Sequence, residues 1–124
     1  MRKTVLIVED NASLRRALCA LFKRQEDFDV CGTAENGHEA IEVAGRLHPD
    51  LVVLDLLMPV MNGLDAAREL KRALPTVPLI MYSALEESLS EQAKLIGISE
   101  IVSKCDHPSL LLEKARALVN SIPT

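Results

Sequence analysis

The chain has almost no aromatic residues. Phe22, Phe28 and Tyr82 are its only aromatics, and it has no tryptophan, so a single-stranded nucleic acid would find few rings on which to stack its bases. A general basic field is also missing, because 18 acidic residues outnumber 14 basic ones and the net charge is −4. We therefore expect no direct binding of nucleic acid. The core must be built from aliphatic side chains.

Paired cysteines and long apolar runs are also missing. Cys19, Cys31 and Cys105 are odd in number and have no paired spacing, which argues against both a disulfide framework and a zinc site and favours free thiols in a reducing compartment. The first apolar run covers only residues 5–8 before two acids, too short for a signal peptide or a membrane span. The expected location is the cytoplasm, without a membrane partner.

No linker, repeat or low-complexity segment divides the chain, so its 124 residues predict one domain over residues 1–124. Within it, short apolar runs alternate with amphipathic segments. The predicted strands cover residues 4–8, 28–34, 51–54, 78–82 and 100–103. The predicted helices run from a cap at Asn11 or Ser13 to about residue 25, and then over residues 36–48, 64–74, 86–96 and 108–122, with Gly97 as the cap of the fourth.

Each predicted helix has an apolar stripe that should face a core. These stripes consist of Leu14, Ala17, Leu18, Leu21 and Phe22; Ala40, Ile41, Ala44 and Leu47; Leu64, Ala67, Leu70 and Leu74; Leu89, Ala93 and Ile96; and Leu111, Ala115, Leu118, Val119 and Ile122. Five strands that are each followed by a helix predict an α/β fold with a parallel sheet and right-handed crossovers. We expect a doubly wound five-stranded sheet of order 2-1-3-4-5, with the first and fifth helices on one face and the other three on the opposite face.

Polar residues stand where four of these strands end. Glu9 and Asp10 follow the first strand, Asp55 the third, Ser83 the fourth and Lys104 the fifth. In a parallel sheet these ends lie on the same edge, where such folds bind their ligands. Three carboxylates gathered there would repel one another, and a magnesium ion, which prefers oxygen ligands, would relieve the repulsion.

The same set of residues suits phosphoryl transfer. An aspartate carboxylate such as that of Asp55 can act as a phosphoryl-accepting nucleophile, while Lys104 offsets charge on the phosphoryl oxygens and the Ser83 hydroxyl donates a hydrogen bond. Taken singly, Asp55 could be a solvated acid that opens a loop, Ser83 a hydroxyl that ends a strand and Lys104 a surface lysine. The coincidence at four strand ends favours the chemical interpretation.

In order and spacing, from about residue 5 to residue 122, the chain closely resembles the receiver domain of bacterial two-component response regulators. The motif positions that carry the resemblance are Glu9-Asp10, Asp55 with Met58-Pro59 and Gly63 behind it, Ser83-Ala84 and Lys104. The resemblance implies a flavodoxin-like receiver fold, and a phosphohistidine on a sensor histidine kinase or a histidine phosphotransfer protein as the phosphodonor. It implies a signalling domain that catalyses only its own phosphorylation and dephosphorylation, rather than an enzyme with a separate substrate.

The resemblance also implies a role for each motif position. Magnesium would be bound by Glu9, Asp10, Asp55 and the backbone carbonyl of Leu57. The phosphoryl group on Asp55 would be contacted by Ser83, Ala84 and Lys104. The surface formed by the fourth helix, the fifth strand and the fifth helix would pass the signal to an output partner or domain, and it is also a candidate for homodimerisation.

Two positions depart from the pattern of the family. Val102 stands where the family usually has an aromatic switch residue, and Cys105 stands where a proline commonly follows the lysine. The first departure argues against a ring switch. The second argues against a cis peptide bond, which is costly without proline.

Other functions remain open at this point. A pseudo-receiver that only binds proteins would keep the fold without phosphorylation, although the complete acid, hydroxyl and lysine set argues against it. A haloacid-dehalogenase-type phosphohydrolase would need a second acid where this chain has Leu57. A flavodoxin-like cofactor binder would find its phosphate repelled by Glu9 and Asp10. No output domain is visible after the last predicted helix.

Overall fold

The computed structural model describes residues 2–55, 63–83 and 90–120, apart from the side chains of residues 83, 90 and 92. Its centre is a five-stranded parallel sheet of order β2-β1-β3-β4-β5, which confirms the predicted order. The strands are β1 Lys3–Val8, β2 Phe28–Ala34, β3 Leu51–Leu54, β4 Leu79–Ser83 and β5 Glu100–Ser103. The helices are α1 Ala12–Lys23, α2 Gly37–Leu47, α3 Gly63–Ala73, α4 Ser90–Ile96 and α5 Pro108–Asn120.

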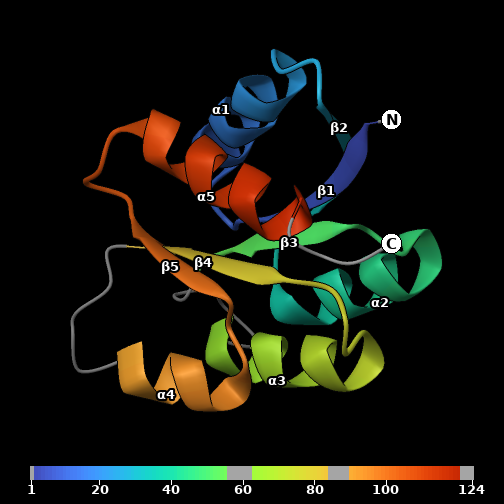
Figure 1. Cartoon of the computed structure of the whole chain (residues 1–124). Coiled ribbons are helices and arrows are strands. Elements are labelled where there is room, and N and C mark those ends of the chain that lie inside the picture. Colours follow the sequence, from blue (N-terminus) through green and yellow to red (C-terminus); the bar gives the residue numbers. More distant parts are fainter. Residues whose placement is uncertain (1, 56–62, 84–89, 121–124) are drawn as a thin grey trace.

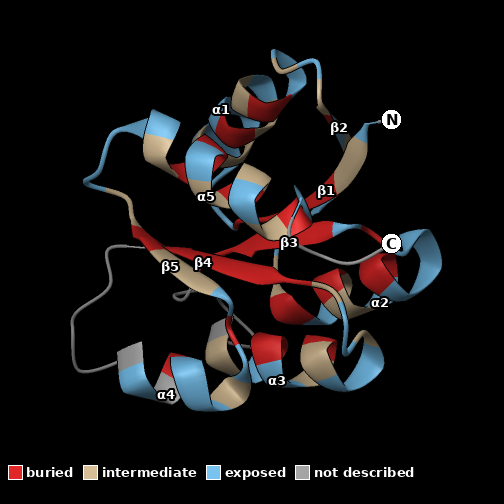
Figure 2. Cartoon of the chain, viewed as in Figure 1, coloured by how far each residue is buried: buried red, intermediate tan, exposed pale blue. Residues whose placement is uncertain are grey.

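The helices cover both faces of the sheet. Figure 1 shows α1 and α5 on one face and α2, α3 and α4 on the other, as the alternating pattern predicts. The central strand β3 is buried along its whole length, because it has strands on both sides and helices above and below it; this explains its continuous apolar run. Figure 2 shows the same division, with buried strands in the middle and exposed residues along the outer helix surfaces.

The sheet separates two hydrophobic clusters. On the α1 and α5 side, Phe22 and Phe28 pack edge to face with their ring centroids 5.2 Å apart. On the other side, aliphatic side chains of α2, α3 and α4 pack against alternate residues of the same strands. Each central strand therefore contributes to both clusters, for example β4 through Ile80 on the first side and Met81 on the second.

Local sequence sets several element boundaries. Asn11, rather than Ser13, caps α1, because its side-chain oxygen accepts a 2.9 Å hydrogen bond from the Leu14 N–H. Asn36 caps α2 in the same way through the N–H of Glu39, also at 2.9 Å. Gly97 has a positive φ of 103° and ends α4, as predicted.

Some predicted boundaries are wrong. Helix α1 ends at Lys23 rather than near residue 25, because the Gln25 side chain turns back and donates to the Leu21 carbonyl at 3.1 Å. Strand β4 begins at Leu79 rather than Pro78, since proline has no N–H to donate to the ladder. It also extends to Ser83. Residues 86–89 and 121–122, predicted to be helical, lie outside the described residues.

The helix stripes are also only partly correct. Ala17 and Leu47, both predicted to face the core, are exposed, whereas Val43 and Leu112 are buried. Ala17 lies at the margin of its stripe. Leu47 occupies the last turn of α2, where it covers Gly32 so closely that an added Cβ would lie 2.9 Å from Leu47 Cδ1.

Two expectations from composition can be compared with the structure. The three cysteines are free, Cys19 and Cys31 partly buried and Cys105 exposed. Burial raises the pKa of the Cys19 and Cys31 thiols. Within residues 2–55, 63–83 and 90–120, no helix combines the length and the apolar character needed to cross a membrane.

Candidate functional site

The backbone ladder brings the acidic residues of β1 and β3 together. Val8 lies opposite Leu54 in the parallel pairing of these strands, so the residues that follow each strand leave the sheet side by side. The Asp55 N–H donates to the Val8 carbonyl at 3.1 Å, and the Glu9 N–H donates to the Ala34 carbonyl at 2.9 Å. Both acids are thus fixed by main-chain hydrogen bonds at the carboxyl edge of the sheet.

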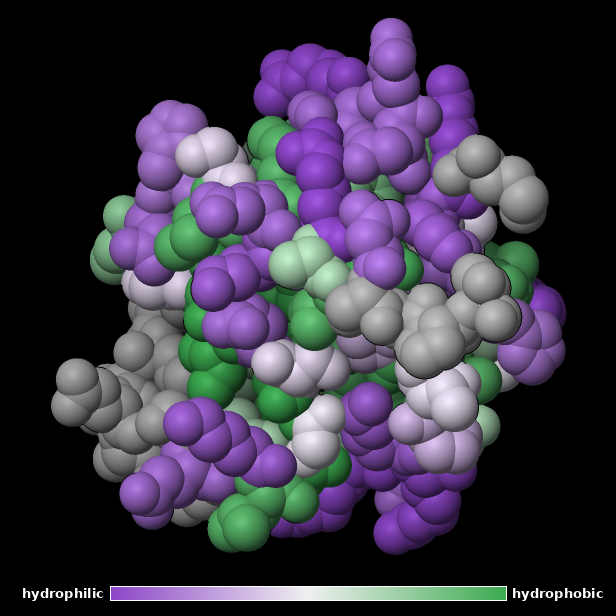
Figure 3. Space-filling view, viewed as in Figure 1, coloured by the Kyte–Doolittle hydropathy of each residue, from purple (hydrophilic) through white to green (hydrophobic). Residues whose placement is uncertain are grey.

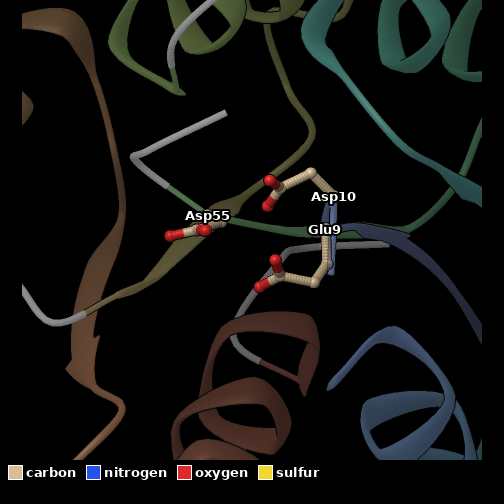
Figure 4. A group of neighbouring side chains, drawn as sticks. All are labelled: Glu9, Asp10 and Asp55. Atoms are coloured by element: carbon tan, nitrogen blue, oxygen red, sulfur yellow. The ribbon is translucent and has the colours of Figure 1, made fainter. Parts of the chain in front are cut away.

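Glu9, Asp10 and Asp55 form a cluster in which one carboxylate oxygen of each lies within 4.8 Å of the others. Figure 4 shows the carboxylates of Glu9 and Asp10 extending from the end of β1 toward the side of the site where Asp55 lies. Glu9 is 1% exposed and Asp55 5% exposed, while Asp10 lies open to solvent. The structure therefore brings together the three acids predicted to bind a metal.

Lys104 follows β5 and reaches into this cluster. Its Nζ lies 3.2 Å from Glu9 Oε1 and 3.2 Å from Asp55 Oδ2. Burial alone would lower the pKa of the Lys104 ammonium, but the charge of Asp55 and the contacts with Glu9 more than offset it and raise that pKa. Lys104 is therefore protonated and lies between two of the predicted metal ligands. At this position its charge would offset the negative charge of a phosphoryl group on Asp55.

Glu9 combines a raised pKa with a buried carboxylate oxygen. Burial is the main cause that raises the pKa of its carboxyl group, and Asp10 and Asp55 add to the effect. Its Oε1 is buried, and the ion pair with Lys104 lacks hydrogen-bond geometry, so this atom accepts no hydrogen bond from any described residue. Carboxylate oxygens are the donors that magnesium prefers, so the residues present fit a magnesium site.

One supporting contact was not foreseen from the sequence. Asn11, predicted only as a helix cap, also donates its backbone N–H to Glu9 Oε2 at 3.1 Å. This bond orients the Glu9 carboxylate from the first residue of the cap. The sequence gives no signal for this contact, because the donor is a backbone N–H and the cap role already explains the Asn side chain.

Other predicted site residues cannot be placed. Leu57, Met58, Pro59 and Ala84 lie outside the described residues, as does the side chain of Ser83. The backbone of Ser83 does lie opposite Ser103 in the register of β4 and β5. Its position in the chain is therefore on the same sheet edge as Lys104.

The two departures from the family pattern fall on described residues. Val102 is 1% exposed and packs within the α1 and α5 cluster. Cys105 is exposed, and no cis peptide bond occurs in the described parts of the chain. The expectation of a trans bond between Lys104 and Cys105 is confirmed.

A groove of about 430 Å³ lies between α1 and the start of α5. It is mainly apolar, and its lining residues are Leu14, Ala17, Leu18, Leu21, Arg24, Tyr82, His107, Pro108, Ser109 and Leu112. The lining residue His107 follows Lys104 by three positions in the sequence, and Tyr82 belongs to β4. We call it the α1–α5 groove.

An exposed leucine marks a second surface. Leu95 in α4 is 89% exposed, and Figure 3 shows hydrophobic atoms projecting at the lower edge of the molecule, over α4. A smaller hollow beside it is lined by Lys94, Ile98, Ser99, Glu100 and Ile101. This surface coincides with the predicted output face.

Known proteins resemble the chain over most of its length. A family model for the response regulator receiver domain matches residues 5–116. The chemotaxis protein CheY of Thermotoga maritima is 36% identical over 114 residues, which cover 91% of this chain and 94% of that protein. The crystal structure of the response regulator domain of Thermotoga maritima CheB superposes with a TM-score of 0.92 at 32% identity, covering 99% of this chain and 100% of that one.

Longer proteins match only in part. A protein-glutamate methylesterase/protein-glutamine glutaminase of Hahella chejuensis is 45% identical over 85 residues. The match covers 68% of this chain but 22% of that protein. A relative of the same name from Methanococcoides burtonii is matched over 94% of this chain and 36% of its own length, so the chain spans about a third of the length of such relatives.

Proposed function

The chain belongs to the family of response regulator receiver domains, and from this premise we propose that Asp55 receives a phosphoryl group from the phosphohistidine of a sensor kinase or a histidine phosphotransfer protein. The observation that carries the proposal is the position of the Asp55 carboxylate. It lies at the carboxyl end of the central strand, beside two further acids and 3.2 Å from the ammonium of Lys104.

The transfer is a simple displacement at phosphorus. A carboxylate oxygen of Asp55 forms a bond to phosphorus while the bond from phosphorus to the histidine nitrogen breaks, and that nitrogen keeps the electron pair. Lys104 offsets the charge that spreads over the phosphoryl oxygens. If the other ring nitrogen of the phosphohistidine carries a proton, the products are an acyl phosphate on Asp55 and a neutral histidine on the donor.

Glu9, Asp10 and Asp55 would hold magnesium, with the carbonyl of Leu57 as a further ligand. When bound, the ion would supply positive charge that offsets the negative charge of the phosphoryl oxygens. Glu9 and Asp10 directly follow the end of β1 at Val8, so both acids leave the sheet at the same strand end.

The direct test is incubation of the protein with magnesium and a small phosphodonor such as phosphoramidate, followed by intact-mass spectrometry. One added phosphoryl group supports the proposal. No added mass, under conditions in which CheY of Thermotoga maritima is phosphorylated, would favour the runner-up function, a pseudo-receiver that only binds proteins.

We place the docking site of the phosphodonor on the α1–α5 groove. The groove is mainly apolar, its lining includes Tyr82 of β4 and His107, three residues after Lys104, and residues 11–25 contain four basic residues and no acidic one. A helix with an apolar stripe and acidic flanks would complement both features. Seated there, it could present a histidine to Asp55.

Replacing Ala17 by aspartate tests this docking site. Ala17 is exposed and lines the groove, so the charge should oppose an apolar, acidic-flanked partner without disturbing the core. We expect phosphoryl transfer from a sensor kinase that phosphorylates the wild-type chain to slow by about tenfold or more, as for a central interface position. Phosphorylation by phosphoramidate should be unchanged.

Leu95→Asp is the matched control, since it places the same charge on an exposed helical position of the opposite face. It should leave transfer from the kinase intact. Equal loss in both variants, or none in Ala17→Asp, would remove the α1–α5 groove as the docking site.

The signal should leave the site through the loop after β4. A phosphoryl group on Asp55 adds charge and acceptor oxygens, which would draw the Ser83 hydroxyl toward it. Val102 is buried and short, with few accessible rotamers, so it cannot report the state by a large swing. The displacement should therefore appear at residues 84–89 and at α4.

We expect Ser83→Ala to accept phosphate at Asp55 but to lose most of the response at α4, because the differential contact that drives the shift is gone. Val102→Ala should retain the response. Amide chemical shifts with and without beryllofluoride, a phosphoryl analogue, measure the difference. The full wild-type perturbation across residues 84–96 in Ser83→Ala would contradict this route.

We also propose a surface through which the phosphorylated domain passes its signal to a partner. The face formed by α4, β5 and α5, which includes the exposed Leu95 of α4, would contact an output partner, an attached domain or a second phosphorylated copy of the chain. Methylesterase and glutaminase activities belong to the longer relatives, and this receiver domain would regulate rather than perform such a reaction. We propose the cytoplasm as its location, in keeping with its free thiols.

A further inference from the structure

Arg15 in the first turns of α1 is joined to the backbone that carries the acidic pair. Its Nη1 donates to the carbonyl oxygen of Glu9 at 2.9 Å and lies 3.5 Å from the carbonyl oxygen of Asp10. Its Nη2 forms an ion pair with Glu35 Oε1 at 3.3 Å. The side chain of Arg15 is 17% exposed, so the guanidinium lies against the protein rather than in solvent.

These contacts begin where the strand ladder stops. Strand β1 ends at Val8, and the Glu9 N–H still donates to Ala34. Beyond that bond, the orientation of the chain at Glu9 and Asp10 depends on other groups. The carbonyl bonds of Arg15 are charge-assisted and therefore stronger than neutral ones, so a single side chain takes over the support of both residues.

The first turn of α1 holds Glu9 at two points. Asn11 donates its N–H to the Glu9 carboxylate, and the Asn11 carbonyl accepts the N–H of Arg15 at 2.8 Å. Arg15 then returns to the Glu9 carbonyl. The carboxylate and the main chain of Glu9 are thus fixed by the same helix end, which leaves little freedom in the direction of the side chain.

We propose that Arg15 is a positioning residue for the proposed magnesium site, on which this role depends. By holding the carbonyl oxygens of Glu9 and Asp10, Arg15 aims their carboxylates at a common cation. Arg15 differs in this respect from Lys104. Lys104 contacts the carboxylate oxygens themselves, whereas Arg15 contacts the carbonyl oxygens of Glu9 and Asp10. It supports the ligands without occupying their ligand atoms.

Two physical effects of Arg15 on magnesium have opposite signs. As a nearby positive charge it repels a divalent cation, so its removal should tighten binding if charge alone matters. As a support it preorganises the ligands, so its removal should weaken binding. The direction of the change therefore separates a positioning role from a general electrostatic one.

The experiment compares Arg15→Met, Arg15→Lys and Arg16→Met by isothermal titration with magnesium at 25 °C, each variant held well below its melting temperature. Arg16 is an exposed neighbour on α1, so its variant has the same change in net charge. We expect about tenfold weaker binding in Arg15→Met, the lower range for loss of a ligand-supporting hydrogen bond, and a smaller loss in Arg15→Lys. Arg16→Met should bind as tightly as the wild type or more tightly.

A second readout does not require the metal. In chelator, hydrogen exchange of the Asn11 amide, the donor to Glu9, should be faster in Arg15→Met than in wild type and unchanged in Arg16→Met. Equal or tighter magnesium binding by Arg15→Met would overturn the role of Arg15 while leaving the metal site intact. A wild-type protein that binds no magnesium would instead overturn the metal site, and the role of Arg15 with it.

Discussion

Asp55→Asn is expected to abolish phosphorylation by phosphoramidate and by sensor kinases, with no phosphoryl group appearing elsewhere in the chain. The amide has nearly the same shape but lacks the nucleophilic carboxylate oxygen, and its nitrogen is a poor attacking group. Residue 55 is buried, but we expect the fold to stay intact in this variant. The hydrogen bond from the N–H of residue 55 to the Val8 carbonyl does not depend on the side chain. Intact-mass spectrometry after incubation with magnesium and donor gives the result.

Asp106→Asn is the matched control, since Asp106 is an exposed aspartate just two positions after Lys104. It should be phosphorylated like the wild type. If Asp55→Asn still acquires label while its melting temperature is unchanged, the phosphoacceptor is another residue and the assignment is wrong. Peptide mapping of the labelled protein would then identify that residue.

The second large effect concerns magnesium. Glu9→Gln combined with Asp10→Asn removes two of the three clustered carboxylates, and we expect magnesium affinity to fall by at least about a hundredfold, beyond the usual effect of supporting residues. The melting temperature of the wild type should rise on addition of magnesium. In the double variant this rise should disappear.

The same double variant should be more stable than the wild type in chelator. Burial and the neighbouring acids raise the pKa of Glu9, so its ionised form is unfavourable in the metal-free fold at neutral pH. A neutral glutamine removes that cost, so the free energy of unfolding in chelator should be higher in the double variant than in the wild type. Glu42→Gln with Asp29→Asn, two exposed acids, gives the same charge change and should show neither effect.

A magnesium-induced rise in melting temperature that persists unchanged in the double variant would place the ion elsewhere. If the double variant loses the magnesium effect but melts at a lower temperature than the wild type in chelator, the assignment of the metal site stands. The predicted relief of repulsion between the acids is then wrong. The two parts of this prediction therefore fail independently.

The sheet and the acid cluster could be predicted from the sequence because both depend on patterns within single segments. Strands β1, β3 and β4 contain short apolar runs, and a parallel arrangement places all strand ends on one edge. Glu9, Asp10, Asp55 and Lys104 were assigned in this way, and the structure brings them together. The positions of Ser83, Ala84 and Leu57 stay predictions.

Features that depend on three-dimensional contacts could not be predicted. Arg15 is one of several arginines and lysines in residues 11–25, and nothing in the sequence distinguishes it, because its partners are backbone carbonyls whose position is set by the fold. Ala17 and Leu47 fit a helical stripe but are exposed, although Leu47 still packs against Gly32. Helical periodicity predicts which side of a helix faces the core, but not how much of that side is covered by neighbouring elements.

The separation of the core by the sheet has a consequence for how this domain can change over evolution. The α1–α5 groove belongs to one hydrophobic cluster, and α4 belongs to the other. Substitutions on opposite sides share no side-chain contacts within a cluster, so their effects on stability should add, with deviations within about 0.5 kcal/mol as for distant sites. Specificity for an incoming partner and specificity for an outgoing one could then diverge independently, and a chimera that exchanges one side should keep the recognition properties of the other.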